Sequence, residues 1–144
     1  MSGPEVQVDD ETIRRALTRS RTIAVVGASP KPERASNRVM RFLIDRGHDV
    51  VAVNPGQAGG TIHGRPCYAG LRDVPHPVDM VDVFRSPDAV PGVVDDVLAL
   101  DTMPSVLWLQ LGVVHETAEG RARDSGVTVI SDRCPKIEVA RLGL

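Results

Sequence analysis

The residues best suited to bind a ligand come directly after five short apolar runs of the sequence. They are Gly27-Ala28-Ser29, Asn54-Pro55, Phe84-Arg85, Gln110-Leu111-Gly112 and Ser131-Asp132-Arg133-Cys134-Pro135. Their hydroxyl, amide, guanidinium and thiol groups can make hydrogen bonds and carry positive charge. They contain no recognisable pair of nucleophile and base, no metal-ligand spacing and no pair of carboxylates. The chemistry that these residues predict is therefore binding rather than turnover.

The stretch after the first apolar run has the features of an anion-binding turn. Gly27 lets the backbone turn close to a ligand, Ser29 offers a hydroxyl, and Lys31 adds a positive charge. Ser36 is expected to cap the helix that follows, whose free N–H groups would face an anion. An ordinary turn between a strand and a helix is the alternative interpretation.

The same stretch does not match the signal of a NAD-binding domain. The sequence G-A-S-P-K-P-E-R-A-S-N-R lacks the G-x-G-x-x-G spacing. After the second apolar run, Asn54-Pro55 stands where an acidic residue would bind the adenosine ribose. These two departures favour a phosphate-bearing nucleotide other than NAD.

Several other side chains near the strand ends have two readings each. The basic residues could contact phosphates or form a solvated surface; they are Lys31, Arg34, Arg38, Arg41 and Arg85. Phe84 could stack on an adenine ring or fill the core. Gln110 is expected to hydrogen-bond a ligand or a neighbouring loop, and Asp82 to be either a buried, hydrogen-bonded carboxylate or the partner of Arg85. The four histidines are predicted to be surface or capping residues.

Five apolar runs rich in β-branched residues predict strands, and helical patterns fall between most of them. The strands are expected at residues 22–27, 49–54, 79–84, 105–110 and 127–131, and the helices at 36–46, 87–100 and 115–125. This alternation predicts a Rossmann-like α/β fold: an open, five-stranded parallel sheet with helices on both faces, in three layers. Residues 55–77 are interpreted as a long loop with room for a short extra strand or turn. Ligands of such sheets bind at the carboxyl ends of the strands.

The chain has the size of one domain. A short helix beginning near Asp10 predicts an N-terminal helix extension over residues 1–20, followed by one binding domain over residues 21–144.

The 17 basic and 19 acidic residues give a net charge of −2 without a cationic block, which argues against nucleic acid as a partner. A membrane-spanning helix needs about 18 consecutive apolar residues, and no apolar stretch of the sequence approaches this length. The N-terminus does not have the pattern of a signal peptide. A cytoplasmic protein is therefore expected.

The motifs VVGAS-P, VNP, VDVFR-SP, WLQLGV and DRCPKIE occur in this order along the chain. In this series the sequence resembles the small single-domain coenzyme A-binding family, whose fold is similar to the N-terminal domain of the succinyl-CoA synthetase alpha subunit. The resemblance covers residues 21–142 and implies a Rossmann-like domain that binds coenzyme A (CoA). It implies phosphates at Gly27, Ala28, Ser29, Lys31 and Ser36, and the rest of the nucleotide along Asn54, Pro55, Phe84 and Arg85. The second domain of the synthetase, which carries its phosphorylated histidine, has no counterpart in this sequence, so ligase activity is not implied.

Cys134 has the most distinctive expected chemistry. Pro135 suits the first position of a short helix, which makes Cys134 its N-cap beside Arg133 and Lys136. A thiol there could form a reversible mixed disulfide with CoA, and the alternative is a cysteine that packs under the last turn. The second cysteine is Cys67, and the spacing of the two predicts neither a structural disulfide nor a zinc site.

Three functions remain open from the sequence. The first is non-catalytic binding of CoA or an acyl-CoA. The second is a nucleotide-binding subunit of an acyl-CoA ligase, which would need a separate catalytic chain as its partner. The third is a NAD(H)-sensing Rossmann module, against which Asn54-Pro55 stands.

Overall fold

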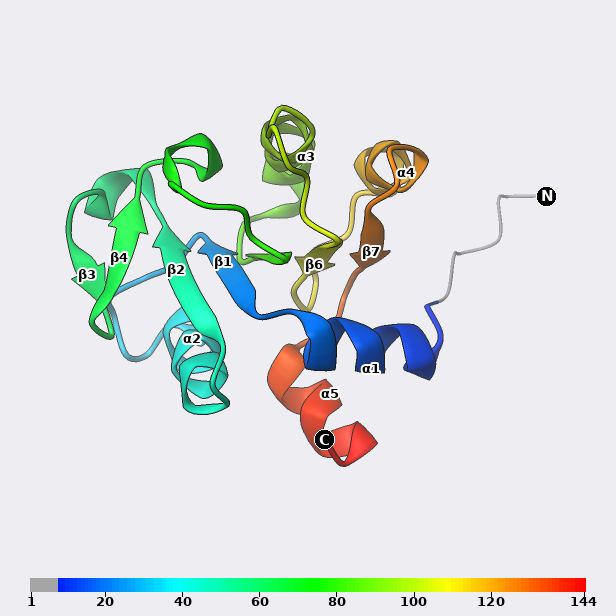
Figure 1. The fold of residues 1–144 in the computed structure, drawn as a ribbon, viewed down its shortest axis with the longest axis horizontal. Coiled ribbons are helices and arrows are strands. Elements are labelled where there is room, and N and C mark those ends of the chain that lie inside the picture. Colours follow the sequence, from blue (N-terminus) through cyan, green and yellow to red (C-terminus); the bar gives the residue numbers. More distant parts are fainter. Residues whose placement is uncertain (1–7) are drawn as a thin grey trace.

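The computed structural model describes residues 8–144, in which strands and helices alternate along most of the chain (Figure 1). The helices are α1 (Asp10–Arg19), α2 (Ala35–Asp45), α3 (Val90–Leu98), α4 (Glu116–Asp124) and α5 (Pro135–Leu142). The strands are β1 (Thr22–Val26), β2 (Asp49–Val53), β3 (Thr61–Ile62), β4 (Arg65–Tyr68), β5 (Met80–Val83), β6 (Val106–Leu109) and β7 (Thr128–Ile130). Short 3₁₀ helices lie at η1 (Pro55–Gln57), η2 (Leu71–Asp73) and η3 (Pro87–Ala89). The part of the predicted extension before Val8 lies outside the described residues.

Within residues 8–144 the strands form one sheet of seven, in the order β3-β4-β2-β1-β5-β6-β7. The five predicted strands are β1, β2, β5, β6 and β7, and they are parallel to one another. The predicted number of five is too small, because β4 adds a parallel strand beside β2 and β3 pairs antiparallel with β4. These two strands fall in the stretch interpreted as loop, where no sustained apolar run marks them.

A two-residue turn joins β3 to β4. His63 and Gly64 both have positive φ, 51° and 74°. Two successive residues of this kind form the type I′ turn, whose twist matches that of a hairpin. Glycine adopts the conformation freely, and histidine is one of the side chains that enter it more readily than most.

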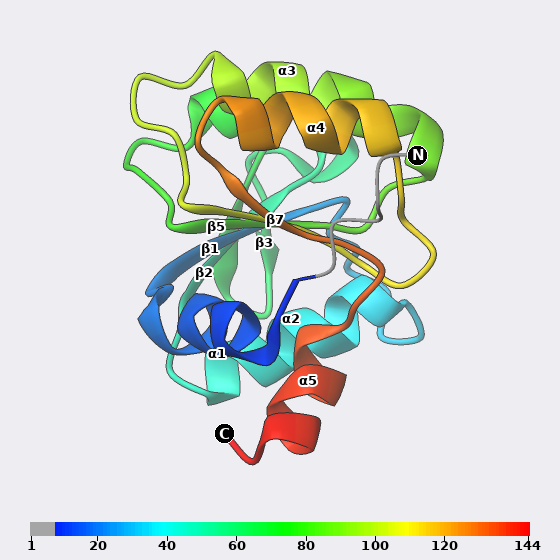
Figure 2. The same ribbon diagram turned by 90° about the vertical axis from the view of Figure 1, so that its right-hand side faces the viewer.

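Helices cover both faces of the sheet, as the alternation predicts (Figure 2). Helices α1, α2 and α5 lie on one face, and α3 and α4 lie on the other. Because side chains alternate along a strand, β1 supplies both apolar cores: Ile23 and Val25 face the first group of helices, Ala24 and Val26 the second.

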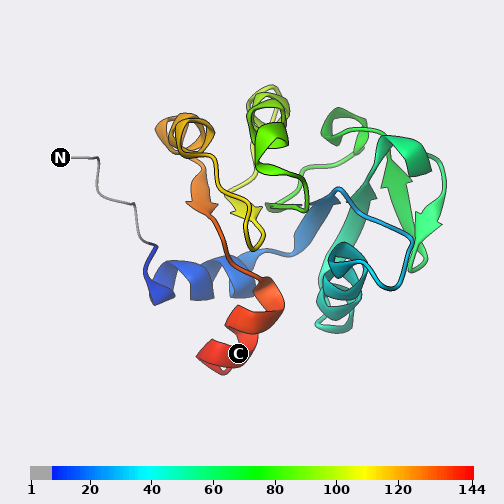
Figure 3. The same cartoon turned by 180° about the vertical axis from the view of Figure 1, so that it is seen from behind.

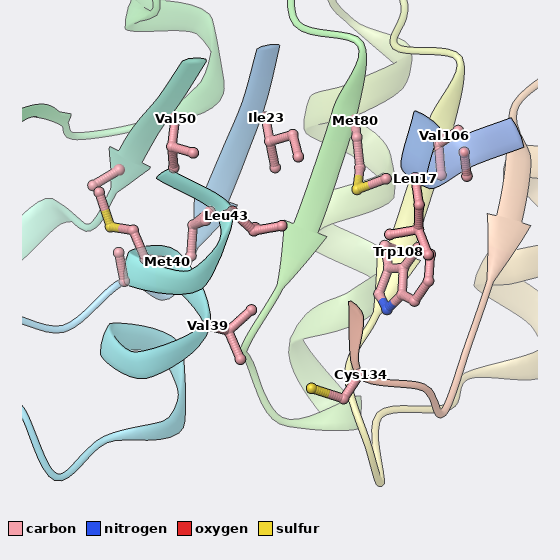
Figure 4. Packing of buried hydrophobic residues seen from close by; sticks show 14 of the residues in the cluster. Leu17, Ile23, Val39, Met40, Leu43, Val50, Met80, Val106, Trp108 and Cys134 are labelled. Atoms are coloured by element: carbon pink, nitrogen blue, oxygen red, sulfur yellow. The ribbon is translucent and has the colours of Figure 1, made fainter. Parts of the chain in front are cut away.

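Trp108 of β6 is fully buried in the core beneath α1, α2 and α5, where Leu17 and Met80 lie beside it (Figure 4). Its indole Nε1–H donates a hydrogen bond to the carbonyl oxygen of Arg133 at 2.8 Å. Leu109, the next residue of β6, is fully buried in the core on the other face of the sheet. Leu17 belongs to α1, so the helix of the predicted extension packs within the same core as Trp108.

The C-terminal helix α5 lies close to α1 (Figure 3). Arg141 of α5 pairs with Asp10 of α1 at 2.8 Å and with the buried Glu138 at 2.9 Å. These contacts join the two ends of the described chain on one face of the sheet. None of the helices within residues 8–144 has the length and apolar character needed to cross a membrane.

The topology places a switch point at the ends of β1 and β5. From β1 the chain passes through α2 to β2, on one side of β1, and later returns to β5 on the other side. Since α2 and α3 lie on opposite faces, the connections that leave β1 and β5 diverge (Figure 2). Ligands of open parallel sheets bind in the crevice at such a point.

Candidate functional site

The carboxyl ends of β1 and β5 approach each other closely at Gly27. Its φ is +84°, and a Cβ added there would lie 2.5 Å from the carbonyl oxygen of Phe84 and 3.1 Å from Cδ of Arg85. Both the conformation and the space therefore require glycine. The backbone N–H of Gly27 donates to the carbonyl oxygen of Val53 at 2.9 Å, which also joins this turn to the end of β2.

Asn54, at the end of β2, fixes the loop that leaves β1. Its Nδ2 donates to the carbonyl oxygen of Ala28 at 2.8 Å, and its Oδ1 accepts from the N–H of Gly56 at 2.9 Å. Both ends of the amide are thus engaged within the protein. The residue that stands in place of a ribose-binding acid holds the loop in position.

Residues 27–34, called here the β1–α2 loop, lead into a helix that no side chain caps. The N-cap of α2 is Arg34, and no side chain accepts from its first N–H groups. The prediction that Ser36 caps α2 is wrong: α2 begins at Ala35, and Ser36 is buried inside the first turn. Ser29 stays at the loop, where its Oγ accepts from the N–H of Lys31 at 3.2 Å. The exposed positive end of α2 suits an anion.

The five predicted basic residues divide into two groups. Lys31, Arg34 and Arg85 are exposed and make no ion pair with the side chains of residues 8–144. Arg38 donates to the carbonyl oxygen of Glu33 at 2.6 Å, within the loop. Arg41 lies farther along α2 and pairs with Asp45 at 3.3 Å. Lys31, Arg34 and Arg85 are therefore the basic side chains best placed to bind an anionic ligand.

A groove opens between these strand ends and α3. Its volume is about 520 Å³. Its wall includes Gly27, Asn54, Pro55, Phe84 and Arg85, five of the residues expected along the nucleotide. The remaining wall combines apolar side chains, among them Leu71 of η2 and valines of β1, β2 and α3, with the carboxylate of Asp96. Gly27 is both a wall residue of the groove and the first residue of the β1–α2 loop, which leads to the start of α2.

Phe84 contributes to both the core and the wall of the groove, and stacking on an adenine ring stays a prediction. Phe84 is half-buried, packs against the core beneath α2, and also lines the groove. An aromatic edge at the wall of a groove can contact a flat ligand ring without leaving the core.

Gln110 and Asp82 form a buried pair behind the site. Gln110 Nε2 donates to Asp82 Oδ1 at 2.7 Å, while Oδ2 has no hydrogen-bond partner within the described residues. Burial raises the pKa of Asp82 to about 7, and the Gln110 hydrogen bond opposes that rise. Of the two readings of Asp82, the buried and hydrogen-bonded carboxylate is the one the structure supports. Gln110 bonds Asp82, which leaves its carbonyl oxygen to interact with other groups.

Cys134 lies on the opposite side of the sheet from the groove. It is the N-cap of α5 and Pro135 is at the first turn, as predicted. Its side chain belongs to the core that contains Val39 and Trp108, and the residue is 9% exposed (Figure 4). Cys67 is buried in the same core, where burial raises the pKa of its thiol.

Three of the four histidines lie at the surface or cap a helix, as predicted, whereas His48 is half-buried. His115 caps α4, its Nδ1 accepting from the N–H of Ala118 at 3.1 Å. His48 is half-buried and its Nδ1 lies 2.7 Å from the carbonyl oxygen of Ser20, and burial lowers its pKa. His76 is exposed, and His63 occupies the hairpin turn.

Two residues at the β1–α2 loop were not predicted from the sequence: Asn37, which contacts the loop, and His63, which contacts Asn37. Asn37 is buried in the first turn of α2, and Nδ2 donates to the carbonyl oxygen of Ser29 at 3.0 Å. His63 reaches Asn37 from the β3–β4 hairpin. The histidine-glycine pair at 63–64 was the available signal for this hairpin, because both positions of its turn need positive φ.

Comparison with known families gives one match that spans most of the chain. The model of a CoA binding domain matches residues 21–140. This range contains every strand of the sheet and all the residues that line the groove.

Individual relatives agree with this match. Over 128 residues the chain is 38% identical to protein YneT of Bacillus subtilis, covering 87% of this chain and 90% of YneT. A solved structure of a Thermus thermophilus protein, 38% identical, has a TM-score of 0.88 and covers 94% of this chain and 99% of that one. Acetate–CoA ligase (ADP-forming) I of Archaeoglobus fulgidus is 27% identical over 113 residues, which are 78% of this chain and 16% of the ligase.

Proposed function

The chain belongs to the family of CoA-binding domains, and from this premise we propose that it binds CoA or an acyl-CoA without converting it. The observation that carries the proposal is the close approach of β1 and β5 at Gly27, where Arg85 lies beside a groove and the β1–α2 loop departs toward the uncapped start of α2. CoA has matching parts, since it combines charged phosphates with a flat adenine ring.

We assign the phosphates to the β1–α2 loop. Lys31 and Arg34 belong to this loop, and the side chain of Arg85 passes close to Gly27. Charge-assisted hydrogen bonds from such groups are the strongest polar contacts that an exposed site can offer a phosphate. Backbone N–H groups at the start of α2 add to the attraction.

We assign the adenine to the groove beside α3. Its wall includes the apolar side chains of Pro55, Leu71 and Phe84, which suit an uncharged aromatic ring. The carboxylate of Asp96 disfavours phosphates beside α3, so we expect the phosphates toward Arg85 and the β1–α2 loop and the adenine beside α3.

Binding without turnover is supported by how the polar strand ends are used. Asn54 is bonded to Ala28 and Gly56, and Gln110 to Asp82. Among the described residues none of these groups is paired as a nucleophile with a base. Their arrangement instead fixes loops, which favours a preformed site.

A mixed disulfide between CoA and Cys134 is the finer part of this proposal. Thiol–disulfide exchange would join Sγ of Cys134 to the CoA sulfur of oxidised CoA disulfide and release the second CoA as a thiolate. Because the cysteine is 9% exposed, the reaction requires a local opening at the start of α5.

A second function is favoured by one comparison. The ligase of Archaeoglobus fulgidus contains a segment similar to most of this chain within a much longer protein. The chain could therefore serve as the CoA-binding subunit of an acyl-CoA ligase whose catalytic part is a separate chain. Affinity purification from native cells separates the two functions, since a stable, stoichiometric catalytic partner would support the subunit.

Native mass spectrometry of the purified protein tests the proposal itself. The expected result is a fraction of molecules heavier by the mass of CoA or an acyl-CoA, and loss of this species in a variant with Lys31 and Arg85 both replaced by alanine. A retained NAD(H) molecule in its place would overturn the proposal.

A further inference from the structure

The β3–β4 hairpin contacts the first turn of α2, into which the β1–α2 loop leads (Figures 1 and 3). The hairpin is itself anchored to the sheet, because Arg65 donates from Nε to the carbonyl oxygen of Val50 at 2.6 Å. Asn37 and His63 connect the two structures. Neither residue lines the groove or carries a charge assigned to the phosphates.

Hydrogen-bond geometry fixes the direction of each contact between them. The carbonyl oxygen of Ser29 can only accept, so the group of Asn37 that lies 3.0 Å from it is the Nδ2 donor. Oδ1 of Asn37 then faces His63, with Nε2 of the ring at 2.9 Å. Nε2 also lies 3.1 Å from the carbonyl oxygen of Asn37. Since both neighbours are acceptors, Nε2 must carry the proton.

The result is a directed chain of hydrogen bonds, His63 to Asn37 to Ser29. Asn37 is 6% exposed whereas His63 is exposed, and removal of the His63 donor would leave Oδ1 of Asn37 with one hydrogen-bond partner fewer. The positive φ of His63 belongs to the turn that presents the ring at this position.

We infer that His63 is a positioning residue of the nucleotide site: acting through Asn37, it holds the β1–α2 loop in its ligand-binding form. This inference rests on the proposed function, since the loop is the segment assigned to the phosphates of CoA. A loop that is ordered before binding loses less conformational entropy when the ligand arrives. The contribution of His63 is therefore expected in the affinity for CoA rather than in the stability of the fold.

Two substitutions separate the hydrogen bond from the turn. Asparagine in His63→Asn tolerates positive φ, but its side chain is too short to place a donor at Asn37. Glutamine in His63→Gln places an N–H donor near the position of Nε2, but it tolerates positive φ less well. His63→Asn should therefore lose more affinity for CoA than His63→Gln, whereas His63→Gln should lose more stability than His63→Asn.

The experiment is calorimetric titration of each variant with CoA, together with its thermal unfolding. His63→Asn should bind CoA about two- to tenfold more weakly than the unchanged protein, the range for one lost hydrogen bond. His63→Gln should bind within about twofold of the unchanged protein and unfold at a lower temperature than His63→Asn. His76→Asn, at an exposed histidine away from the loop, is the matched control and should change neither quantity.

Unchanged affinity in His63→Asn, or equal weakening in both variants, would overturn the inference. Amide hydrogen exchange of the ligand-free protein distinguishes this failure from failure of the proposed function. Residues 29–36 should exchange faster in His63→Asn than in His63→Gln. If the unchanged protein does not bind CoA but this difference is present, the proposed function fails and the positioning role stands.

Discussion

A Cβ at position 27 would lie 2.5 Å from the carbonyl oxygen of Phe84. The ends of β1 and β5 are therefore so close that no side chain fits between their backbones at this position. We expect Gly27→Ala to destabilise the fold by about 2 kcal/mol or more, because it adds a clash to a φ of +84°. Denaturant unfolding measures the change.

Gly92→Ala is the matched control for that substitution. A Cβ at Gly92, in α3, meets no atom within 4 Å. Alanine in a helix is favoured over glycine by about 0.5–1 kcal/mol, so this variant should be as stable as the unchanged protein or more so. Equal destabilisation by both variants would show that the close approach of Phe84 to Gly27 is not the cause of the lost stability.

The exposed basic side chains make a prediction about the phosphates of CoA. Lys31→Ala and Arg85→Ala should each weaken CoA binding by about ten- to hundredfold, the range for one charge-assisted hydrogen bond. If a basic side chain binds the 3′-phosphate, its substitution should affect CoA more than 3′-dephospho-CoA, and titration of both ligands identifies it. Arg14→Ala, on α1, is the control and should bind CoA normally. Unaltered binding in both site variants would remove these residues from the site.

Asp82 makes stability depend on pH. Burial raises its pKa in the folded protein to about 7, from an ordinary value of 3.8. The folded state therefore binds more protons than the unfolded state between these values, and the contribution of Asp82 to stability decreases as pH rises from about 4 to about 7. In Asp82→Asn this contribution should vanish, since an amide does not ionise.

The measurement is the free energy of unfolding of both proteins between pH 5 and 8. The free energy of unfolding of Asp82→Asn, relative to that of the unchanged protein, should increase as pH rises over this range. If the difference in unfolding free energy between the two proteins does not change with pH, the pKa of Asp82 is not raised. If the difference shrinks as pH rises, the pKa of Asp82 is lowered instead.

Cys134 gives a chemical prediction. Incubation with oxidised CoA disulfide should add one CoA to the protein, seen by intact mass without reductant and reversed by reductant. Cys134→Ser should abolish the adduct and Cys67→Ser should keep it, since burial raises the pKa of the Cys67 thiol. The opposite pattern, or no adduct, would leave Cys134 with its packing role alone.

The fold was predictable from the sequence where apolar runs are long enough to form buried strands. Five parallel strands and the helices between them follow from such runs, and so does the meeting of Gly27, Asn54 and Phe84 at one edge. The short strands β3 and β4 have no such run, so the sequence indicates only a long loop with room for one short extra strand or turn where the structure has two strands. Their order in the sheet depends on contacts between segments that local patterns do not describe.

The site was predictable at its strand ends and less so along α2. A serine before an apolar pattern suggests an N-cap, but the loop enters α2 at Arg34 and buries Ser36. Asn37 and His63 lie 26 residues apart and meet only because a hairpin folds beside the loop. The choice between partners for Asp82 likewise required the three-dimensional distance to Gln110.

Calorimetric titration of the unchanged protein with CoA and with NAD is the most direct test of the central claim, that this site binds CoA. The account predicts a dissociation constant for CoA on the order of micromolar or tighter and no measurable binding of NAD, because Asn54 stands where a ribose-binding acid would be. NAD binding as tight as that of CoA, or no heat with CoA, would contradict it.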